Sequence, residues 1–256
     1  MLITICQLPN DEGAFEDSWR KLADHVIGTS ADIVLLPEMP FGPWLAASPE
    51  PDSQKWQDSV FRHEQWCQKL PELGQVSVVA TRPVIDNDVP QNRGFVFEAG
   101  NVVDVHTKVY LPREEYYWEA NWYQPGHGDF DVFTVGGVPS GMMICTDMWF
   151  MQNARAIGKR GAELLFVPRA TPANSLDNWL AGARVLAMIS GCYVFSSNLC
   201  APHAPDADLG GQGHAIDPEG KVLGITSAES PFFTVEVDPA LARAAKSTYP
   251  RYVEGD

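Results

Sequence analysis

The chain has 256 residues, 45% of them hydrophobic, and carries a formal net charge of −15 at pH 7. That length and composition are enough for a sizeable hydrophobic core. The acidic excess argues against nucleic acid or an anionic membrane as a partner, and no run of eighteen apolar residues predicts a membrane-spanning helix.

The N-terminus and the cysteines bear on the compartment. The chain begins Met1-Leu-Ile-Thr-Ile-Cys6, without a basic leader or a long apolar stretch, so no signal peptide is expected. Five cysteines are present: Cys6, Cys67, Cys145, Cys192 and Cys200. An odd number without a CxxC pair fits reduced thiols better than a disulfide framework or a zinc site. We therefore expect a cytoplasmic protein.

Strands and helices alternate in the first half of the chain. The predicted strands, all apolar runs, are residues 2–6, 32–36 and 76–80. The predicted helices, with apolar residues at helical spacing, are residues 15–27 and 53 to about 70. Residues 81–91, rich in Asp, Asn and Pro, are interpreted as a loop. Residues 94–111 read as a hairpin with its turn at Ala99-Gly100-Asn101.

The second half repeats this alternation. Residues 116–128 are predicted to form an aromatic loop. The predicted strands are residues 129–135, 138–144, 163–167, 192–197, 212–216, 222–225 and 232–237. The predicted helices are residues 150–159 and 176–190, the second ended by Gly191. Because no linker or repeat divides the chain, we expect a single layered α/β domain over residues 1–256.

Three reactive side chains stand where apolar runs end, namely Glu38, Lys108 and Cys145. A short apolar run is typical of a buried strand, and open sheets place their chemistry at the carboxyl ends of strands. A carboxylate, an ammonium and a thiol brought together there supply a base, an oxyanion donor and a nucleophile. A helix start after Cys145 would also favour its thiolate.

Each of these residues alone also fits a structural role. Cys145 would serve equally as a buried structural cysteine, and Glu38 as an exposed loop carboxylate. Lys108 would then extend from an edge strand into solvent, and His106 is read as a structural histidine. Between residues 113 and 126 three carboxylates occur, so spacing alone selects none, and the aromatic residues there either line a pocket or pack a loop.

Taken together and in order, the motifs are far more specific. They are Leu-Pro-Glu38, Lys108-x-x-Leu111, Ile-Cys145-x-Asp147, Gly161-Ala-Glu163 before an apolar strand and a proline, Tyr193-Val-Phe-Ser-Ser-Asn198, and Ile216-Asp-Pro-Glu-Gly220. Across almost its whole length the chain thus resembles the nitrilase superfamily of carbon–nitrogen hydrolases. The resemblance implies a four-layer αββα sandwich, a homodimer or larger homo-oligomer, and a hydrolase that requires no metal or organic cofactor.

The resemblance also implies the catalytic residues. Glu38, Lys108 and Cys145 match the family's catalytic triad. The family's second glutamate usually lies seven residues before the glycine of a Pro-Gly pair, which here gives Glu119. In this reading Glu38 takes the thiol proton, Lys108 and the backbone N–H of Thr146 hold the oxyanion, and Glu119 orients Lys108 and substrate.

The branch and the substrate are less well defined. Thr146-Asp147 looks like the amidase and carbamoylase branches, whereas nitrile-cleaving members usually carry Trp-Glu there. The common Arg-Ala-x-Glu-Asn run is replaced by Leu186-Ala-Met-Ile-Ser190. The predicted substrate-binding residues are Thr146, Trp122, Trp149 and Tyr116, and the expected substrate is a small amide or carbamoyl compound. An apolar or planar part of that substrate is suggested by the aromatic residues Tyr116, Tyr117, Trp118, Trp122, Tyr123 and Trp149. Alternatives are an N-carbamoyl hydrolase, a nitrilase, an acyltransferase, a Cys–His hydrolase and a non-catalytic binding member.

Overall fold

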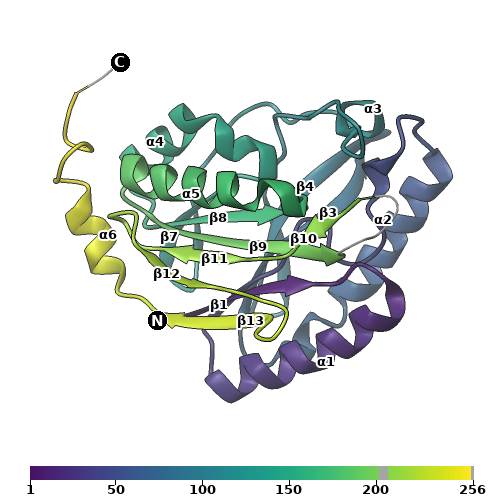
Figure 1. Ribbon diagram of the computed structural model, residues 1–256, viewed down its shortest axis with the longest axis horizontal. Coiled ribbons are helices and arrows are strands. Elements are labelled where there is room, and N and C mark those ends of the chain that lie inside the picture. Colours follow the sequence, from purple (N-terminus) through teal and green to yellow (C-terminus); the bar gives the residue numbers. More distant parts are fainter. Residues whose placement is uncertain (202–206, 255–256) are drawn as a thin grey trace.

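Two β-sheets lie face to face at the centre of the molecule and are joined where β1 meets β9 (Figure 1). The computed structural model describes residues 1–201 and 207–254. The first sheet contains β1 (Leu2–Leu8), β2 (Ile33–Leu35), β3 (Ser77–Asp86), β4 (Val89–Glu98), β5 (Asn101–Thr107) and β13 (Phe232–Glu236). The second contains β6 (Phe133–Val135), β7 (Val138–Met142), β8 (Leu164–Arg169), β9 (Tyr193–Ala201), β10 (Leu209–Gly210), β11 (His214–Ile216) and β12 (Val222–Ile225).

Helices cover the outer face of each sheet, which gives four layers (Figure 1). The α-helices are α1 (Glu12–Thr29), α2 (Ser53–Cys67), α3 (Glu119–Trp122), α4 (Met151–Lys159), α5 (Leu176–Ser190) and α6 (Pro239–Ala245). The 3-10 turns are η1 (Leu45–Ala47), η2 (Leu70–Leu73), η3 (Cys145–Trp149) and η4 (Ala173–Ser175). The predicted αββα sandwich is confirmed. None of the helices in the described part of the chain is both long and apolar enough to cross a membrane.

The alternation of side chains along β1 explains why these layers form. Ile3 and Ile5 are fully buried in the core that includes residues of the second sheet. Cys6 and Leu8 point the other way and pack with the apolar side of α1. Successive strand residues face opposite sides of a sheet, so one strand supplies two cores. Full burial of an aliphatic side chain contributes about 1.5–3 kcal/mol.

Parallel pairing aligns the strand ends that matter for the site. β1, β2 and β3 run parallel in the first sheet, and β7, β8 and β9 run parallel in the second. The carboxyl ends of parallel strands meet at one edge. The segments after β2, β7 and β8 therefore leave the sheets at the edge where chemistry is expected.

One stretch differs from its prediction. Residues 81–91 were expected to form a loop, but they belong to the hairpin of β3 and β4, in which Pro83 pairs with Asn92. The turn lies at Asn87 and Asp88, whose φ values of 50° and 66° are both in the left-handed region. Asn and Asp tolerate this geometry, which is that of a tight hairpin turn. The prolines and polar residues of this hairpin made it look like a loop.

Candidate active site

Glu38 leaves the sheet just after β2 and is fully buried. Its backbone N–H donates to the carbonyl oxygen of Arg169 at the end of β8, at 3.2 Å. Its Oε1 accepts hydrogen bonds from Lys108 Nζ and Asn92 Nδ2, both at 2.8 Å. Its Oε2 is buried and has no partner among the described residues. One carboxylate oxygen is therefore held in place while the other is free to act as a base.

Lys108 is the first residue after β5 and is also fully buried. Its Nζ lies 2.8 Å from Glu38 Oε1 and 2.5 Å from Glu119 Oε2. Burial by itself would lower the pKa of this ammonium, but the Glu119 and Glu38 carboxylates raise it well above its usual value. Lys108 therefore remains a cation between two carboxylates.

Glu119 begins α3 and is the buried carboxylate of its segment, because Glu114 and Glu115 are exposed. The Tyr123 hydroxyl donates to the same oxygen that Lys108 contacts. Burial raises the pKa of Glu119 to about 7, although the neighbouring ammonium works in the opposite direction. The structure thus distinguishes among three carboxylates that spacing alone could not separate.

Cys145 opens the turn that follows β7 and is buried. Its φ of 48° lies in the left-handed region, where a residue with a side chain is strained. Burial raises the pKa of its thiol well above the usual value, and the Glu38 carboxylate adds to this effect. The thiol therefore needs a base. The helix expected directly after Cys145 begins only at Met151, because the 3-10 turn η3 comes between them.

Two polar residues that support this site were not predicted as part of it. Asn92 holds the Oε1 of Glu38, and it was missed because it lies beside the stretch interpreted as a loop. The Asp147 carboxylate oxygens accept hydrogen bonds from the backbone N–H groups of Val109 and Ile144, each with an N···O distance of 3.1 Å. His106 also lies 2.9 Å from Asp147 through Nε2, which agrees with its structural interpretation.

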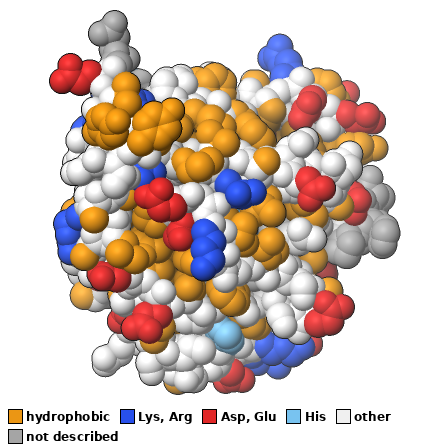
Figure 2. All heavy atoms as spheres, turned by 60° about the vertical axis from the view of Figure 1, so that its left-hand side comes forward, with side chains coloured by type: hydrophobic (Ala, Val, Ile, Leu, Met, Phe, Trp, Pro, Cys, Tyr) orange, Lys and Arg blue, Asp and Glu red, His pale blue; other side chains and the backbone are white. Residues whose placement is uncertain are grey.

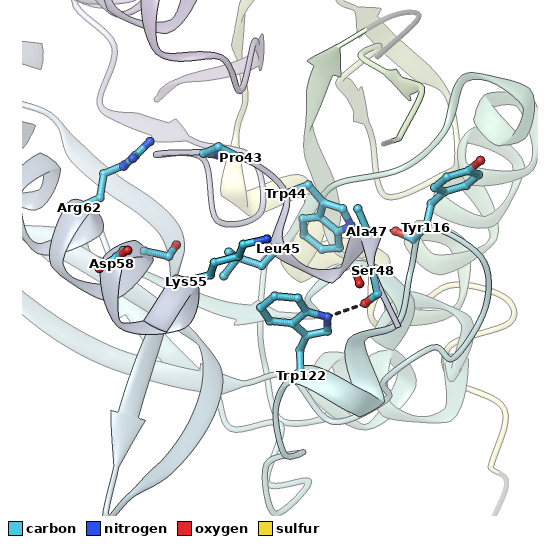
Figure 3. A pocket seen from close by; sticks show the side chains of 11 residues that line it. Pro43, Trp44, Leu45, Ala47, Ser48, Lys55, Asp58, Arg62, Tyr116 and Trp122 are labelled. Atoms are coloured by element: carbon cyan, nitrogen blue, oxygen red, sulfur yellow. Dashed lines mark hydrogen bonds between the residues drawn. The ribbon is translucent and has the colours of Figure 1, made fainter. Parts of the chain in front are cut away.

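Only two of the four predicted substrate-binding residues line the same pocket. Thr146 is half-buried, and no described residue accepts its backbone N–H. Trp149 is 42% exposed and packs on Trp179, with ring centroids 5.1 Å apart. Tyr116 and Trp122 border a hollow of about 440 Å³ beside α2 (Figure 3).

The hollow in Figure 3 adjoins the segments that carry the two glutamates but is not lined by them. Its aromatic walls include Trp44, and Lys55, Asp58 and Arg62 reach it from one side of α2. The Trp122 indole N–H donates to the carbonyl oxygen of Ser48 at 2.6 Å, which fixes that wall. Within the part of the chain that the structure describes, no three His, Cys, Asp or Glu side chains form a metal cluster.

The sequence of nearly the whole chain matches a known protein family. The sequence model of the carbon–nitrogen hydrolase family matches residues 2–247. The chain belongs to this family. It is therefore a carbon–nitrogen hydrolase of the nitrilase superfamily, as its motifs predicted.

Relatives with assigned activities include several amidases, a citrullinase and a nitrilase. The chain is 26% identical to the 2-oxoglutaramate amidase of Bacillus subtilis (strain 168) over 211 residues, which cover 81% of this chain and 78% of that protein. It is 28% identical to the N-carbamoylputrescine amidase of Arabidopsis thaliana over 138 residues. That match covers 48% of this chain and 46% of the plant protein, so it spans about half of each.

Solved structures share the fold at lower identity. The carbon–nitrogen hydrolase of Helicobacter pylori G27 superposes with a TM-score of 0.87 at 18% identity, covering 98% of this chain and 94% of that one. An amidase from Nesterenkonia sp. AN1, described with acrylamide added to its active-site cysteine, gives a TM-score of 0.78 at 21% identity. That match covers 95% of each chain.

Proposed function

We propose that the protein is an amidase that hydrolyses a carboxamide or N-carbamoyl group of a small molecule through a thioester on Cys145. The observation that carries this proposal is the position of Lys108 Nζ, 2.8 Å from Glu38 and 2.5 Å from Glu119 in a fully buried site. A fixed cation between two carboxylates, near a buried thiol, suits chemistry in which negative charge develops on a carbonyl oxygen.

The first half of the reaction forms the thioester. Glu38 Oε2, which has no partner among the described residues, takes the Sγ proton of Cys145 as the sulfur attacks the carbonyl carbon. Lys108 and the backbone N–H of Thr146 hold the oxyanion that results. When the tetrahedral intermediate collapses, the carbon–nitrogen bond breaks. Glu38 returns the proton to the departing nitrogen, which leaves as ammonia or an amine.

The second half releases the acyl group. Glu38 takes a proton from water, and the hydroxide attacks the thioester carbon. The carbon–sulfur bond breaks, the Cys145 thiolate recovers the proton, and a carboxylic or carbamic acid leaves. Glu119 is not consumed in either half. It holds Lys108 in position through the 2.5 Å contact, and the Tyr123 hydroxyl holds Glu119.

An amide suits this site better than a nitrile does. An amide passes through an oxyanion that an ammonium and a backbone N–H stabilise directly, whereas a nitrile first forms a thioimidate whose nitrogen must be protonated. The residues Thr146-Asp147 support the same choice. The named relatives include both classes, the two amidases and a nitrilase of Pyrococcus abyssi that is 30% identical over 112 residues. Nitrile hydrolysis and acyl transfer to an amine are the alternatives, because both use the same covalent intermediate.

A panel of matched amides, N-carbamoyl compounds and nitriles tests the proposal through ammonia release and kcat/KM. We expect higher kcat/KM for the amide or carbamoyl member of each pair. Mass spectrometry on wild-type protein should find an acyl adduct on Cys145, and Cys145→Ala should fold but show no turnover. If nitriles have the higher kcat/KM across several pairs, the assignment is wrong.

We further propose that the enzyme is cytoplasmic and assembles as a homo-oligomer. All five cysteines are free, as expected of a reducing compartment. Apolar side chains gather on the face that includes α6, shown in Figure 2. Leu241 of α6 is 58% exposed, and Tyr249 and Tyr252 in the following segment are 73% and 62% exposed. Exposed apolar clusters of this kind mark protein interfaces.

A further inference from the structure

The hydroxyl of Tyr117 is buried and has no hydrogen-bond partner among the described residues. The backbone on either side is fixed, because Tyr117 N–H donates to the Glu114 carbonyl at 2.9 Å and Glu114 N–H donates to the Tyr117 carbonyl at 3.3 Å. The ring lies against Trp44, with centroids 6.1 Å apart. A buried polar group without a partner costs free energy, so an orphan hydroxyl on a fixed loop requires an explanation.

The side chain of Tyr117 lies among residues that neighbour the catalytic side chains. Its side chain packs against an apolar cluster that includes Met39, Tyr123 and Ala170. Each of these adjoins a residue of the site: Met39 follows Glu38, Tyr123 bonds to Glu119, and Ala170 follows Arg169, whose carbonyl oxygen accepts the Glu38 N–H.

The charges around this hydroxyl determine its hydrogen-bonding role. Burial raises the pKa of Tyr117, and the carboxylates of Glu38, Glu114 and Glu119 raise it further. The phenol therefore keeps its proton and is available as a donor. The polar atom it meets must be an acceptor, and the described protein supplies none.

We propose that Tyr117 is a specificity-determining residue, whose hydroxyl donates a hydrogen bond to the carbonyl oxygen of the bound substrate. This proposal rests on the proposed amidase function. A site built to hydrogen-bond a substrate oxygen discriminates strongly against an analogue that lacks it. A nitrile has no carbonyl oxygen, so Tyr117 favours amides over nitriles. Tyr116, its exposed neighbour, lines the separate hollow.

The test measures binding without turnover. Calorimetric titration compares Cys145→Ala with the double variant Cys145→Ala/Tyr117→Phe, using a matched amide and nitrile pair whose amide the wild type hydrolyses. We expect Tyr117→Phe to raise the Kd of the amide about tenfold, the effect of one hydrogen bond, and to leave the Kd of the nitrile unchanged. In otherwise wild-type enzyme the same substitution should lower kcat/KM for the amide.

Two controls separate this role from a structural one. Tyr117→Phe should leave the melting temperature unchanged or raise it, because the hydroxyl has no partner to lose in the free protein. Tyr193→Phe removes another buried hydroxyl, which donates to the Asp238 carbonyl at 3.3 Å, and should leave amide binding unaltered.

Three results overturn the role of Tyr117. The first is an unchanged Kd for the amide, and the second is an equal rise in Kd for the amide and the nitrile. The third is a lowered melting temperature together with weaker binding of both compounds. In each case the proposed function stands, provided that the wild type hydrolyses the amide. A wild type that prefers the nitrile overturns both proposals.

Discussion

The carboxylate of Asp147 accepts the backbone N–H of Tyr110 at 2.9 Å. Asp147 lies two residues after Cys145, and Tyr110 lies two residues after Lys108. This contact therefore joins the turn that carries the thiol to the segment that carries the ammonium. The second carboxylate oxygen of Asp147 accepts a hydrogen bond from the backbone N–H of Ile144, the residue before Cys145. One buried side chain thus fixes the distance between nucleophile and cation.

We expect Asp147→Asn to lower both the melting temperature and kcat. An amide offers one acceptor oxygen where the carboxylate has two, so its NH₂ group would face an N–H donor. An unsatisfied buried donor costs about 1–3 kcal/mol, and each kcal/mol shifts the melting temperature by about 2–4 °C in a chain of this size. Asp129→Asn, at an exposed position, should change neither quantity. Wild-type stability and kcat in Asp147→Asn would contradict the role assigned to this carboxylate.

Glu38→Gln should reduce kcat about a hundred- to ten-thousandfold, the usual contribution of a general base. Glutamine has the same shape and retains an oxygen for the contacts with Lys108 and Asn92, so the fold should persist. Circular dichroism and steady-state kinetics on the same preparation check both expectations. Substantial activity in Glu38→Gln would mean that another group removes the thiol proton.

Lys108→Met should also abolish most activity while the protein folds. Its removal takes away the cation that lies between the Glu38 and Glu119 carboxylates. Loss of one oxyanion donor typically costs about a hundred- to a thousandfold in rate. Because the proposed chemistry needs no metal, EDTA should not change wild-type kcat. An EDTA-sensitive activity that zinc restores would show that the site has been misassigned.

The pH dependence of kcat/KM should report on Glu119. Burial raises its pKa to about 7, and its proposed form is the carboxylate that holds Lys108. Activity should therefore rise as pH increases through about 7 and level off above. The folded protein binds this proton more tightly than the unfolded chain between pH 4.5 and 7, so over that range Glu119 makes the free energy of unfolding fall as pH rises.

Two variants separate Glu119 from other carboxylates. Glu119→Gln should remove the rise near pH 7 from whatever activity remains, because the group whose pKa burial raises to about 7 is then gone. Glu115→Gln, at an exposed position of the same segment, should preserve the profile. A profile that Glu119→Gln leaves unaltered would assign the titration to another group.

Periodic signals in the sequence predicted the regular elements well. Helix α5 has the predicted bounds, Leu176–Ser190, because helical spacing ends at Gly191, whose φ of 65° suits glycine. The β3–β4 hairpin was missed because its turn and prolines outweighed a weak strand pattern. Helix α6 and the two-residue strand β10 were not predicted, since neither is long enough for a period to emerge.

Some residues of the candidate site could also be predicted from the sequence, and others could not. Glu38, Lys108 and Glu119 were identified because family motifs have fixed spacing, and the structure brings them within contact of one another. Asn92 could not be assigned from sequence, because its role depends on which side of β4 faces the site. Tyr116 and Tyr117 are adjacent tyrosines that the sequence cannot tell apart. Only the folded loop shows that the hydroxyl of Tyr117 is the buried one.

The last prediction concerns assembly through the face shown in Figure 2. Leu241 lies on α6 and is 58% exposed, within the apolar face that a second chain would cover. We expect Leu241→Asp to shift the oligomer toward monomer in light scattering coupled to gel filtration, since a charge buried in an apolar interface is strongly unfavourable. Phe61→Asp, on α2 at the other side of the molecule, introduces the same charge at a residue that is 60% exposed. It should leave the molecular mass unchanged. A monomeric wild type, or equal dissociation by both variants, would show that this face is not the interface.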